Sequence, residues 1–254
     1  MKRMSRGPWA RFVPSAVCVL STAWVAGGVL SPASAADLSS LQLLSQSEFR
    51  QLAQDLGGIA SFKGLASATP LGVTGFDVAT SLSWSTLAHR EVWNKAAAGL
   101  GSPSAVPVPA LRLAKGGPWG LDVGVMASTV PATGAQLSGA ELRWALIEGG
   151  PVTPALGLRL HATRLSGVKQ LSLGTSGFDV TLSKGFALVT PYIGAGALRT
   201  AATAQVSTAL AGENLSTSRL FAGAHLNFGL FDVTLEADRS SDLRTVSGRL
   251  GYRF

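Results

Sequence analysis

The last twelve residues of this chain, LRTVSGRLGYRF, alternate strictly between two kinds of position. One set is mainly apolar and consists of Val246, Leu250, Tyr252 and Phe254, with Gly248 in the gap. The other set is small or charged and includes Arg249 and Arg253. A period of two places the two sets on opposite faces of a β-strand. The chain is therefore expected to end in a strand with one apolar face and one polar face.

The same alternation recurs along most of the chain. The expected strands are 75–87, 107–114, 119–129, 138–148, 154–165, 170–183, 189–199, 217–228, 231–238 and the closing strand. Pro107 and Pro109 interrupt the second segment, because proline donates no ladder hydrogen bond. The count is therefore about ten, within a range of eight to twelve. After residue 35 no apolar run reaches the ~18 residues of a membrane-spanning helix.

These strands predict an all-β fold, an antiparallel up-and-down transmembrane β-barrel. Short connections (115–118, 148–154, 184–188, 229–231) alternate with longer ones such as 88–106 and 200–216, as in outer-membrane barrels. The expected periplasmic end collects aromatic residues, namely Phe76, Trp119, Phe186, Tyr192, Phe228, Phe231, Tyr252 and Phe254. A soluble β-sandwich also alternates, but the polar face here is mostly Gly, Ser, Thr and Ala, which suits an enclosed lumen.

The first 35 residues have the layout of a secretory signal peptide. Lys2, Arg3, Arg6 and Arg11 precede a mostly apolar stretch, and Ala33-Ser34-Ala35 supplies a small-residue cleavage site. A permanent anchor is the alternative. Removing the four basic residues leaves 17 of 21 against 14 acidic ones, a formal charge of +3 that indicates no nucleic-acid partner. The single cysteine, Cys18, leaves with the leader.

Residues 36–72 form a separate periplasmic or lumen segment before the 73–254 barrel. Ser45 and Glu48 have the spacing of a helix-capping box. Phe49, Leu52 and Leu56 then recur at helical spacing. The sequence predicts a short amphipathic helix over 46–56, ended by Gly57-Gly58. Its apolar stripe has to be buried, either inside the lumen, which it would partly block, or against the periplasmic rim.

Charged residues on the inward face predict a lumen network. It comprises Asp77, Glu141, Arg159, Asp232, Glu236, Arg249 and Arg253. Arg253 is expected to face Asp77, Glu141 to lie near Arg159, and Arg249 to meet Glu236. Charges in a lumen must pair or stay hydrated. The network is read either as a structural plug of ion pairs or as a charged constriction that selects solutes.

No pattern in the sequence specifies chemistry. His89 lies in the first external loop, and His161 and His225 are expected to face inward, with His161 opposite Glu141. A catalytic triad is defined by geometry that the sequence does not give. No His/Cys cluster has metal-ligand spacing, so neither a metal nor another cofactor is predicted.

The closing strand resembles the last strand of bacterial outer-membrane β-barrels, which ends in Phe with an aromatic two residues earlier. PLGVTGFDVATSL (70–82), preceded by EFRQLAQDLGG, resembles a set of proteobacterial outer-membrane proteins, and PYIGAGA (191–197) is similar to strands of small OmpA- and OmpW-like barrels. The resemblance implies a Gram-negative outer-membrane location, outer-membrane lipid around the barrel, and recognition of Leu250, Tyr252 and Phe254 by the barrel-assembly machinery.

Three functions follow as hypotheses. The leading one is a structural or surface-interaction barrel with a largely occluded lumen. The second is a narrow pore for small or apolar solutes, gated by the N-terminal helix. The third is a lipid- or peptide-modifying enzyme of the outer membrane. The sequence leaves the ligand and the oligomeric state open.

Overall fold

The computed structural model describes residues 40–97, 104–130, 134–150, 152–206 and 209–254. The predicted signal peptide and Cys18 lie outside this range. Within it, no helix is long and apolar enough to cross a membrane.

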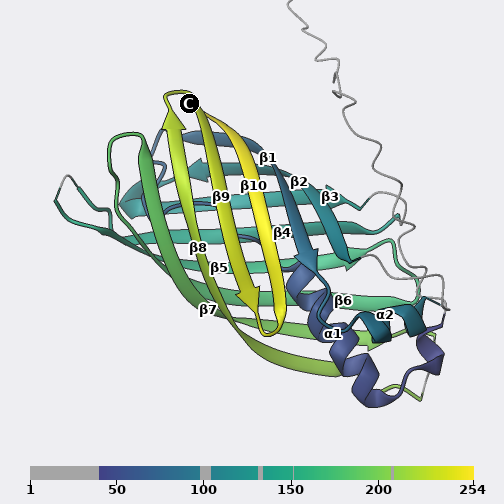
Figure 1. The fold of residues 1–254 in the computed structure, drawn as a ribbon. Coiled ribbons are helices and arrows are strands. Elements are labelled where there is room, and N and C mark those ends of the chain that lie inside the picture. Colours follow the sequence, from purple (N-terminus) through teal and green to yellow (C-terminus); the bar gives the residue numbers. More distant parts are fainter. Residues whose placement is uncertain (1–39, 98–103, 131–133, 151, 207–208) are drawn as a thin grey trace, which may run out of the picture. The chain divides into compact units, whose positions relative to one another are not determined.

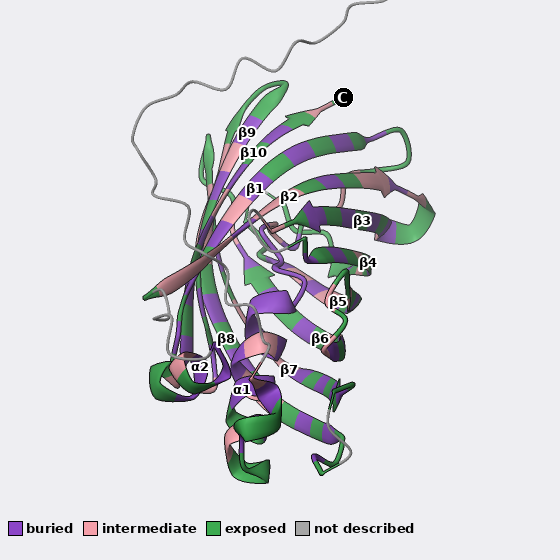
Figure 2. Ribbon diagram, turned by 90° about the vertical axis from the view of Figure 1, so that its right-hand side faces the viewer, coloured by how far each residue is buried: buried purple, intermediate pink, exposed green. Residues whose placement is uncertain are grey.

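Ten antiparallel strands form one closed barrel in which β1 pairs with β10 (Figure 1). They are β1 (Phe76–Thr86), β2 (Ala105–Gly116), β3 (Leu121–Thr129), β4 (Gln136–Ile147), β5 (Ala155–Ser166), β6 (Leu171–Ser183), β7 (Val189–Ala204), β8 (Glu213–Phe228), β9 (Phe231–Ser240) and β10 (Leu243–Arg253). The predicted fold class and the count of ten strands are confirmed. Along most strands buried and exposed residues alternate, which Figure 2 shows as bands.

The seam between β1 and β10 runs from Asp77 opposite Arg253 to Thr86 opposite Arg244. The proline-containing strand β2 pairs with β1 along its whole length, but with β3 only over 111–116. Pro107 and Pro109 therefore lie where β2 has no partner on the β3 side. Their missing N–H groups remove no bond from that ladder, so the second predicted segment is a strand despite them.

The barrel has two distinct ends. We call the end that carries Phe76 and Phe254, whose rings stack with centroids 5.6 Å apart, the terminal end. The opposite end is the plug end. Its connections are 87–104, 130–135, 167–170, 205–212 and 241–242, whereas those at the terminal end are 117–120, 148–154, 184–188 and 229–230. The longest connections lie at the plug end, but 167–170 and 241–242 there are tight turns too.

The outward face of the barrel is apolar. Side chains such as Leu113, Val125, Leu160, Leu220 and Leu250 are each at least 49% exposed. At the terminal end, Phe76, Trp119, Phe186, Phe228, Phe231, Tyr252 and Phe254 are also exposed. This is the surface that a strand barrel presents to lipid, with an aromatic girdle at one interface. Tyr192 was wrongly expected in the girdle; it is 2% exposed and points into the lumen.

A helix precedes the barrel and packs into its plug end. Helix α1 (Gln46–Ala60) begins with the predicted capping box between Ser45 and Glu48. Phe49 and Leu52 are fully buried and Leu56 is half-buried. Inward-facing apolar side chains receive them, including Val108, Met126, Leu137, Leu171, Leu173, Leu215 and Leu243. Figure 1 shows α1 at the end of the barrel opposite the C-terminus, so its apolar stripe is buried among inward-facing side chains of the wall at that end.

The predicted helix end is wrong. Gly57-Gly58 does not stop α1, which continues to Ala60. These glycines instead allow close approach to the wall, since a Cβ on Gly57 would lie 2.7 Å from Cγ2 of Thr200, and one on Gly58 would collide with Leu243. Glycine in a helix interior destabilises the helix by about 1 kcal/mol relative to alanine. At these two positions the absence of a side chain is what allows the helix to pack closely against the wall.

Shorter elements complete the plug end. They are the 3-10 turn η1 (Leu41–Leu43) and helix α2 (Arg90–Ala96) in the β1–β2 connection. A second 3-10 turn, η2 (Pro118–Gly120), joins β2 to β3 at the terminal end. Trp93 of α2 is 6% exposed and belongs to the same apolar cluster as Phe49. The helix α1 is therefore covered by α2 as well as by the barrel wall.

We expect Gly57→Val to destabilise the folded barrel by about 1–3 kcal/mol, because the new side chain overpacks against Thr200. The readout is the temperature at which the protein loses its compact migration on a gel. Gly150→Ala is the matched control, because a Cβ there meets nothing within 4 Å. Adding Thr200→Ala should recover part of the loss, and a Gly57→Val protein as stable as the control would contradict this packing.

Candidate functional site

Residues 61–75 connect α1 at the plug end to β1 at the terminal end, and they run through the lumen. Phe62, Lys63 and Leu65 are buried at 4% exposure or less. The coil has no strand partner, so its backbone groups need others. We call this stretch the threaded coil.

Arginines of the wall satisfy the carbonyl groups of the threaded coil. Arg112 donates to the carbonyl oxygens of Lys63 and Gly64 at 2.7 and 3.0 Å. Arg159 donates to the carbonyl oxygen of Phe62 at 3.1 Å. The guanidinium of Arg112 also lies 4.6 Å from the centroid of the Phe62 ring, a cation–π contact. The entry of the coil is therefore fixed by the interior of the barrel.

Acceptors of the wall bind the N–H groups further along the coil. The N–H of Leu65 donates to Glu236 at 3.0 Å, and that of Ala68 to the Ser183 hydroxyl at 3.1 Å. The N–H of Leu71 donates to Asp122. Leu65 has φ of 50°, a left-handed conformation that costs about 1–2 kcal/mol outside glycine. The bond to Glu236 helps hold this strained residue in place.

The charges around the threaded coil are balanced. The lumen network, counted over the described residues, has seven cations and seven carboxylates. They are Lys63, Arg112, Arg143, Arg159, Arg219, Arg249 and Arg253, with Asp77, Asp122, Glu141, Asp179, Asp232, Glu236 and Asp238. Six of the cations belong to the wall. Lys63, which pairs with Asp238 at 3.2 Å, is the seventh and comes from the coil.

All seven predicted network residues lie in this interior. Arg249 pairs with Asp77 and, at 2.5 Å, with Asp232. Arg253 pairs with Asp77 at 3.1 Å. The expected contact between Arg249 and Glu236 does not form, because each has nearer partners on its own part of the wall.

The other predicted pair lies deeper in the lumen. Arg159 and Glu141 are 3.3 Å apart. Glu236 pairs instead with Arg219 at 2.9 Å and accepts the Tyr192 hydroxyl at 2.9 Å. The side chain of Arg219 is completely buried and also contacts Asp179 and Asp238. It is the centre of the network.

The sequence interpretation missed half of the network. The missed residues are Lys63, Arg112, Asp122, Arg143, Asp179, Arg219 and Asp238. Six of them lie at inward positions of their strands, so strand parity alone would have identified them. Arg112 is one of these six and lies on the proline-containing strand β2. Lys63 precedes the first strand, and no periodicity assigns it to the lumen.

The three histidines have different environments. His161 and His225 are buried in the lumen, at 5% and 4% exposure. His161 contacts Asp179 at 3.5 Å and makes no hydrogen bond to Glu141, although the two residues are opposite in register. His225 shares a 2.9 Å hydrogen bond with Thr234. Within the described residues there is no metal-binding group of three or more His, Cys, Asp and Glu side chains.

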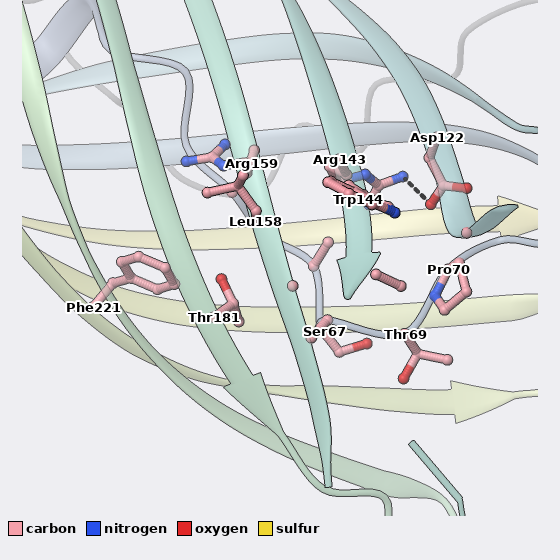
Figure 3. Close-up of a pocket in the computed structure, with 16 residues that line it drawn as sticks. Ser67, Thr69, Pro70, Asp122, Arg143, Trp144, Leu158, Arg159, Thr181 and Phe221 are labelled. Carbon is pink, nitrogen blue, oxygen red and sulfur yellow. Dashed lines mark ion pairs between the residues drawn. The ribbon is translucent and has the colours of Figure 1, made fainter. Parts of the chain in front are cut away.

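A small cavity lies beside the threaded coil near the terminal end. Figure 3 shows Ser67, Thr69 and Pro70 of the coil on one side, and the Asp122–Arg143 ion pair, 3.4 Å, on the wall. Its volume is about 30 Å³. A single water molecule needs about 10–15 Å³ on this measure, so the cavity has room for only a few water molecules.

At the plug end, polar contacts tie α1 to the β1–β2 connection. Asp55 of α1 is 1% exposed and accepts from the Trp93 indole at 3.0 Å and from the His89 backbone N–H at 3.0 Å. The His89 ring lies 2.9 Å from the same carboxylate. His89 therefore has a structural partner that the sequence did not reveal.

Glu48 forms a second tie. Lys95 of α2 donates to its carboxylate at 2.8 and 2.9 Å, and the backbone N–H of Ser45 donates at 2.7 Å. These bonds, the one from Lys95 first, lower the pKa of Glu48 from 4.5 to about 2. The charged form of Glu48 therefore favours the assembled plug end.

Comparisons with known proteins give only a general likeness. No protein-family model matches the sequence, and no curated protein matches it. Similar solved structures include the N-terminal β-barrel domain of OprF from Pseudomonas aeruginosa, with 12% identity, coverage of 72% of this chain and 99% of that chain, and a TM-score of 0.39. Neisserial surface protein A gives 9% identity, 70% and 94% coverage, and a TM-score of 0.31.

An outer-membrane protein of Vibrio cholerae, OmpT with its loop L8 deleted, gives 13% identity, 59% and 55% coverage, and a TM-score of 0.31. At such low similarity no residue role or activity transfers to this chain. The architecture described above rests on the strand pairing of the chain itself.

We expect Arg219→Gln to destabilise the protein by about 3–5 kcal/mol, because it leaves buried carboxylates without their partner. Arg239→Gln is the control: its side chain and that of its partner Asp242 are 58% and 66% exposed, so losing this pair is expected to change stability by less than about 1 kcal/mol. Thermal loss of compact gel migration measures both. Equal effects of the two substitutions would contradict a central role for Arg219.

The lowered pKa of Glu48 predicts a pH dependence of the plug end. Because the pKa of Glu48 is lower in the folded protein, its ionised carboxylate stabilises the folded state at pH values above its ordinary pKa of 4.5. This contribution is lost as the pH falls from 4.5 through about 2. NMR titration of the Glu48 carboxyl carbon should show the low pKa, and Lys95→Met should raise it. An ordinary pKa in the unsubstituted protein would contradict the Lys95–Glu48 contact.

Proposed function

We propose that this chain is an integral outer-membrane protein with a structural or surface-interaction role, and that its lumen is closed to solutes. The apolar outward face and the aromatic girdle support the membrane location. The predicted signal peptide, and recognition of Leu250, Tyr252 and Phe254 by the assembly machinery, belong to the same proposal.

The observation that carries the closed state is the segment formed by α1 and the threaded coil. At the plug end α1 is embedded in apolar side chains, and moving it out would expose Phe49 and Leu52 to water. Deeper in the lumen, removing the coil would take Lys63 away from Asp238 and leave the wall network with one uncompensated carboxylate. Both costs oppose opening and favour a permanent plug over a gate.

The orientation of the barrel determines what reaches the surface. In outer-membrane barrels short turns face the periplasm and longer loops face outward. The long connections 87–104 and 205–212 lie at the plug end. We therefore place α1, α2 and residues 40–45 on the outer side, where they form the surface available to a partner.

Single-channel recording tests the closed lumen. We expect the full protein to stay at baseline in planar bilayers, and a variant lacking residues 36–71, which removes both α1 and most of the threaded coil, to show channel openings. Steady conductance by the full protein would overturn the proposal in favour of the pore hypothesis.

Cysteine labelling tests the orientation independently. In a Cys18→Ala background, Leu43→Cys introduces a thiol at a position 61% exposed at the plug end. Val152→Cys does so at a position 89% exposed at the terminal end. A membrane-impermeant maleimide should label Leu43→Cys in intact cells, and Val152→Cys only after the outer membrane is permeabilised. The reverse pattern would refute the orientation.

A further inference from the structure

Four arginines occupy the outward face of the barrel close to its plug end. They are Arg164 on β5, Arg199 on β7, Arg239 on β9 and Arg244 on β10, all exposed. The neighbouring residues on each strand show that these side chains point away from the lumen. For example, Asp238 and Ser240 on either side of Arg239 are buried. We call these four residues the outer arginine belt.

The belt lies where the apolar surface ends. Two positions before Arg239 on the outward face is Ala237, preceded by Leu235, which is 57% exposed. Two positions after Arg244 is Val246, 61% exposed. The strands that lie between those of the arginines carry exposed serines near the same end, Ser176 on β6 and Ser218 on β8. In a bilayer this level corresponds to the headgroups of the outer leaflet.

The belt differs from the interior in its charge pairing. Every arginine of the lumen network has a carboxylate partner. In contrast, the described residues provide no ion pair for Arg164, Arg199 or Arg244. Arg239 reaches Asp242 at 3.3 Å, with both side chains more than half exposed. The positive charge of the belt is therefore largely uncompensated by the protein.

Two of the arginines directly oppose each other. Arg239 and Arg244 are register partners across the β9–β10 ladder, on the same face. Like charges at directly opposite positions are destabilising, and an anion between them would relieve the repulsion. Arg164 and Arg199 are separated by strand β6, roughly 10 Å across the sheet. The arrangement offers more than one anion position around the barrel.

The terminal end is built differently. Its basic residues Lys115 and Lys184 donate to backbone carbonyl groups of the chain, those of Val73 and Gly150. The interface there is formed by aromatic rings. Guanidinium groups that are free of protein partners are found on the outward face at the plug end, which indicates a ligand specific to that side of the membrane.

We propose that the outer arginine belt binds the phosphate groups of phosphorylated lipid headgroups in the outer leaflet. Guanidinium binds phosphate through paired N–H donors, and its long stem allows it to reach from the wall to headgroup level. This inference rests on the proposed outer-membrane location. It adds the class of lipid that the barrel would hold around itself.

The test uses the purified full chain in nanodiscs and measures its affinity for lipid A, for lipid A stripped of its phosphates, and for inorganic phosphate. We expect at least about tenfold tighter binding of intact lipid A than of the stripped lipid, since each arginine near an anionic surface contributes about fivefold. Inorganic phosphate should not compete at equal concentration, because the belt holds headgroups at the lipid boundary.

The decisive variant replaces Arg164, Arg199, Arg239 and Arg244 with glutamine and should lose this preference to within about twofold. The control, Lys115→Gln with Lys184→Gln, removes charge from the terminal end and should keep it. Compact gel migration verifies that each variant folds. If the variant with all four substitutions does not fold, the single variants Arg199→Gln and Arg244→Gln take its place, and each is expected to bind intact lipid A about fivefold more weakly.

Equal affinity of wild type for both lipids, or a fourfold variant that binds as wild type does, would overturn the proposal. Competition by inorganic phosphate would overturn the lipid as the ligand. The cysteine labelling described above is unaffected by these results, so a failure of the belt and a failure of the proposed location are distinguishable.

Discussion

The compensation of charge inside the barrel is the constraint on which the rest of the structure depends. A charged group removed from water is tolerated only beside a partner, and the lumen network contains fourteen such groups, seven of each sign. Arg219 illustrates the interdependence, since it contacts Asp179, Glu236 and Asp238 at once. The threaded coil enters this arrangement as one member of it, through Lys63 and through its backbone groups.

The lumen consequently has two regions with different physics. At the plug end the inward face is apolar, and the stripe of α1 is buried there by the hydrophobic effect. Toward the terminal end the inward face is charged, and the coil is held by hydrogen bonds that have direction and register. The apolar region buries Phe49 and Leu52 of α1, whereas the hydrogen bonds of the charged region determine the path that the coil follows.

The sequence predicts the barrel well because a period of two is a property of each strand alone. Ten strands, the lumen charges Asp77 and Arg249, and the capping box at Ser45 all follow from local pattern. The end of the barrel that receives α1 does not follow, because it depends on inward residues such as Leu173 and Leu215, which come from different strands. The length of α1 was missed for a similar reason: whether Gly57 stops a helix or packs against Thr200 is decided by a contact between residues 143 positions apart in the chain.

The threading of the coil also restricts the order in which the protein can assemble. The coil is covalently continuous with β1, and β1 closes the barrel by pairing with β10 at the far end of the chain. If the barrel closed first, the whole of α1 would have to pass through an interior that is crowded with paired side chains. Closure of the β1–β10 seam therefore comes last, around a segment already in place. The segment that fills the barrel is thus also the surface on which its final seam is formed.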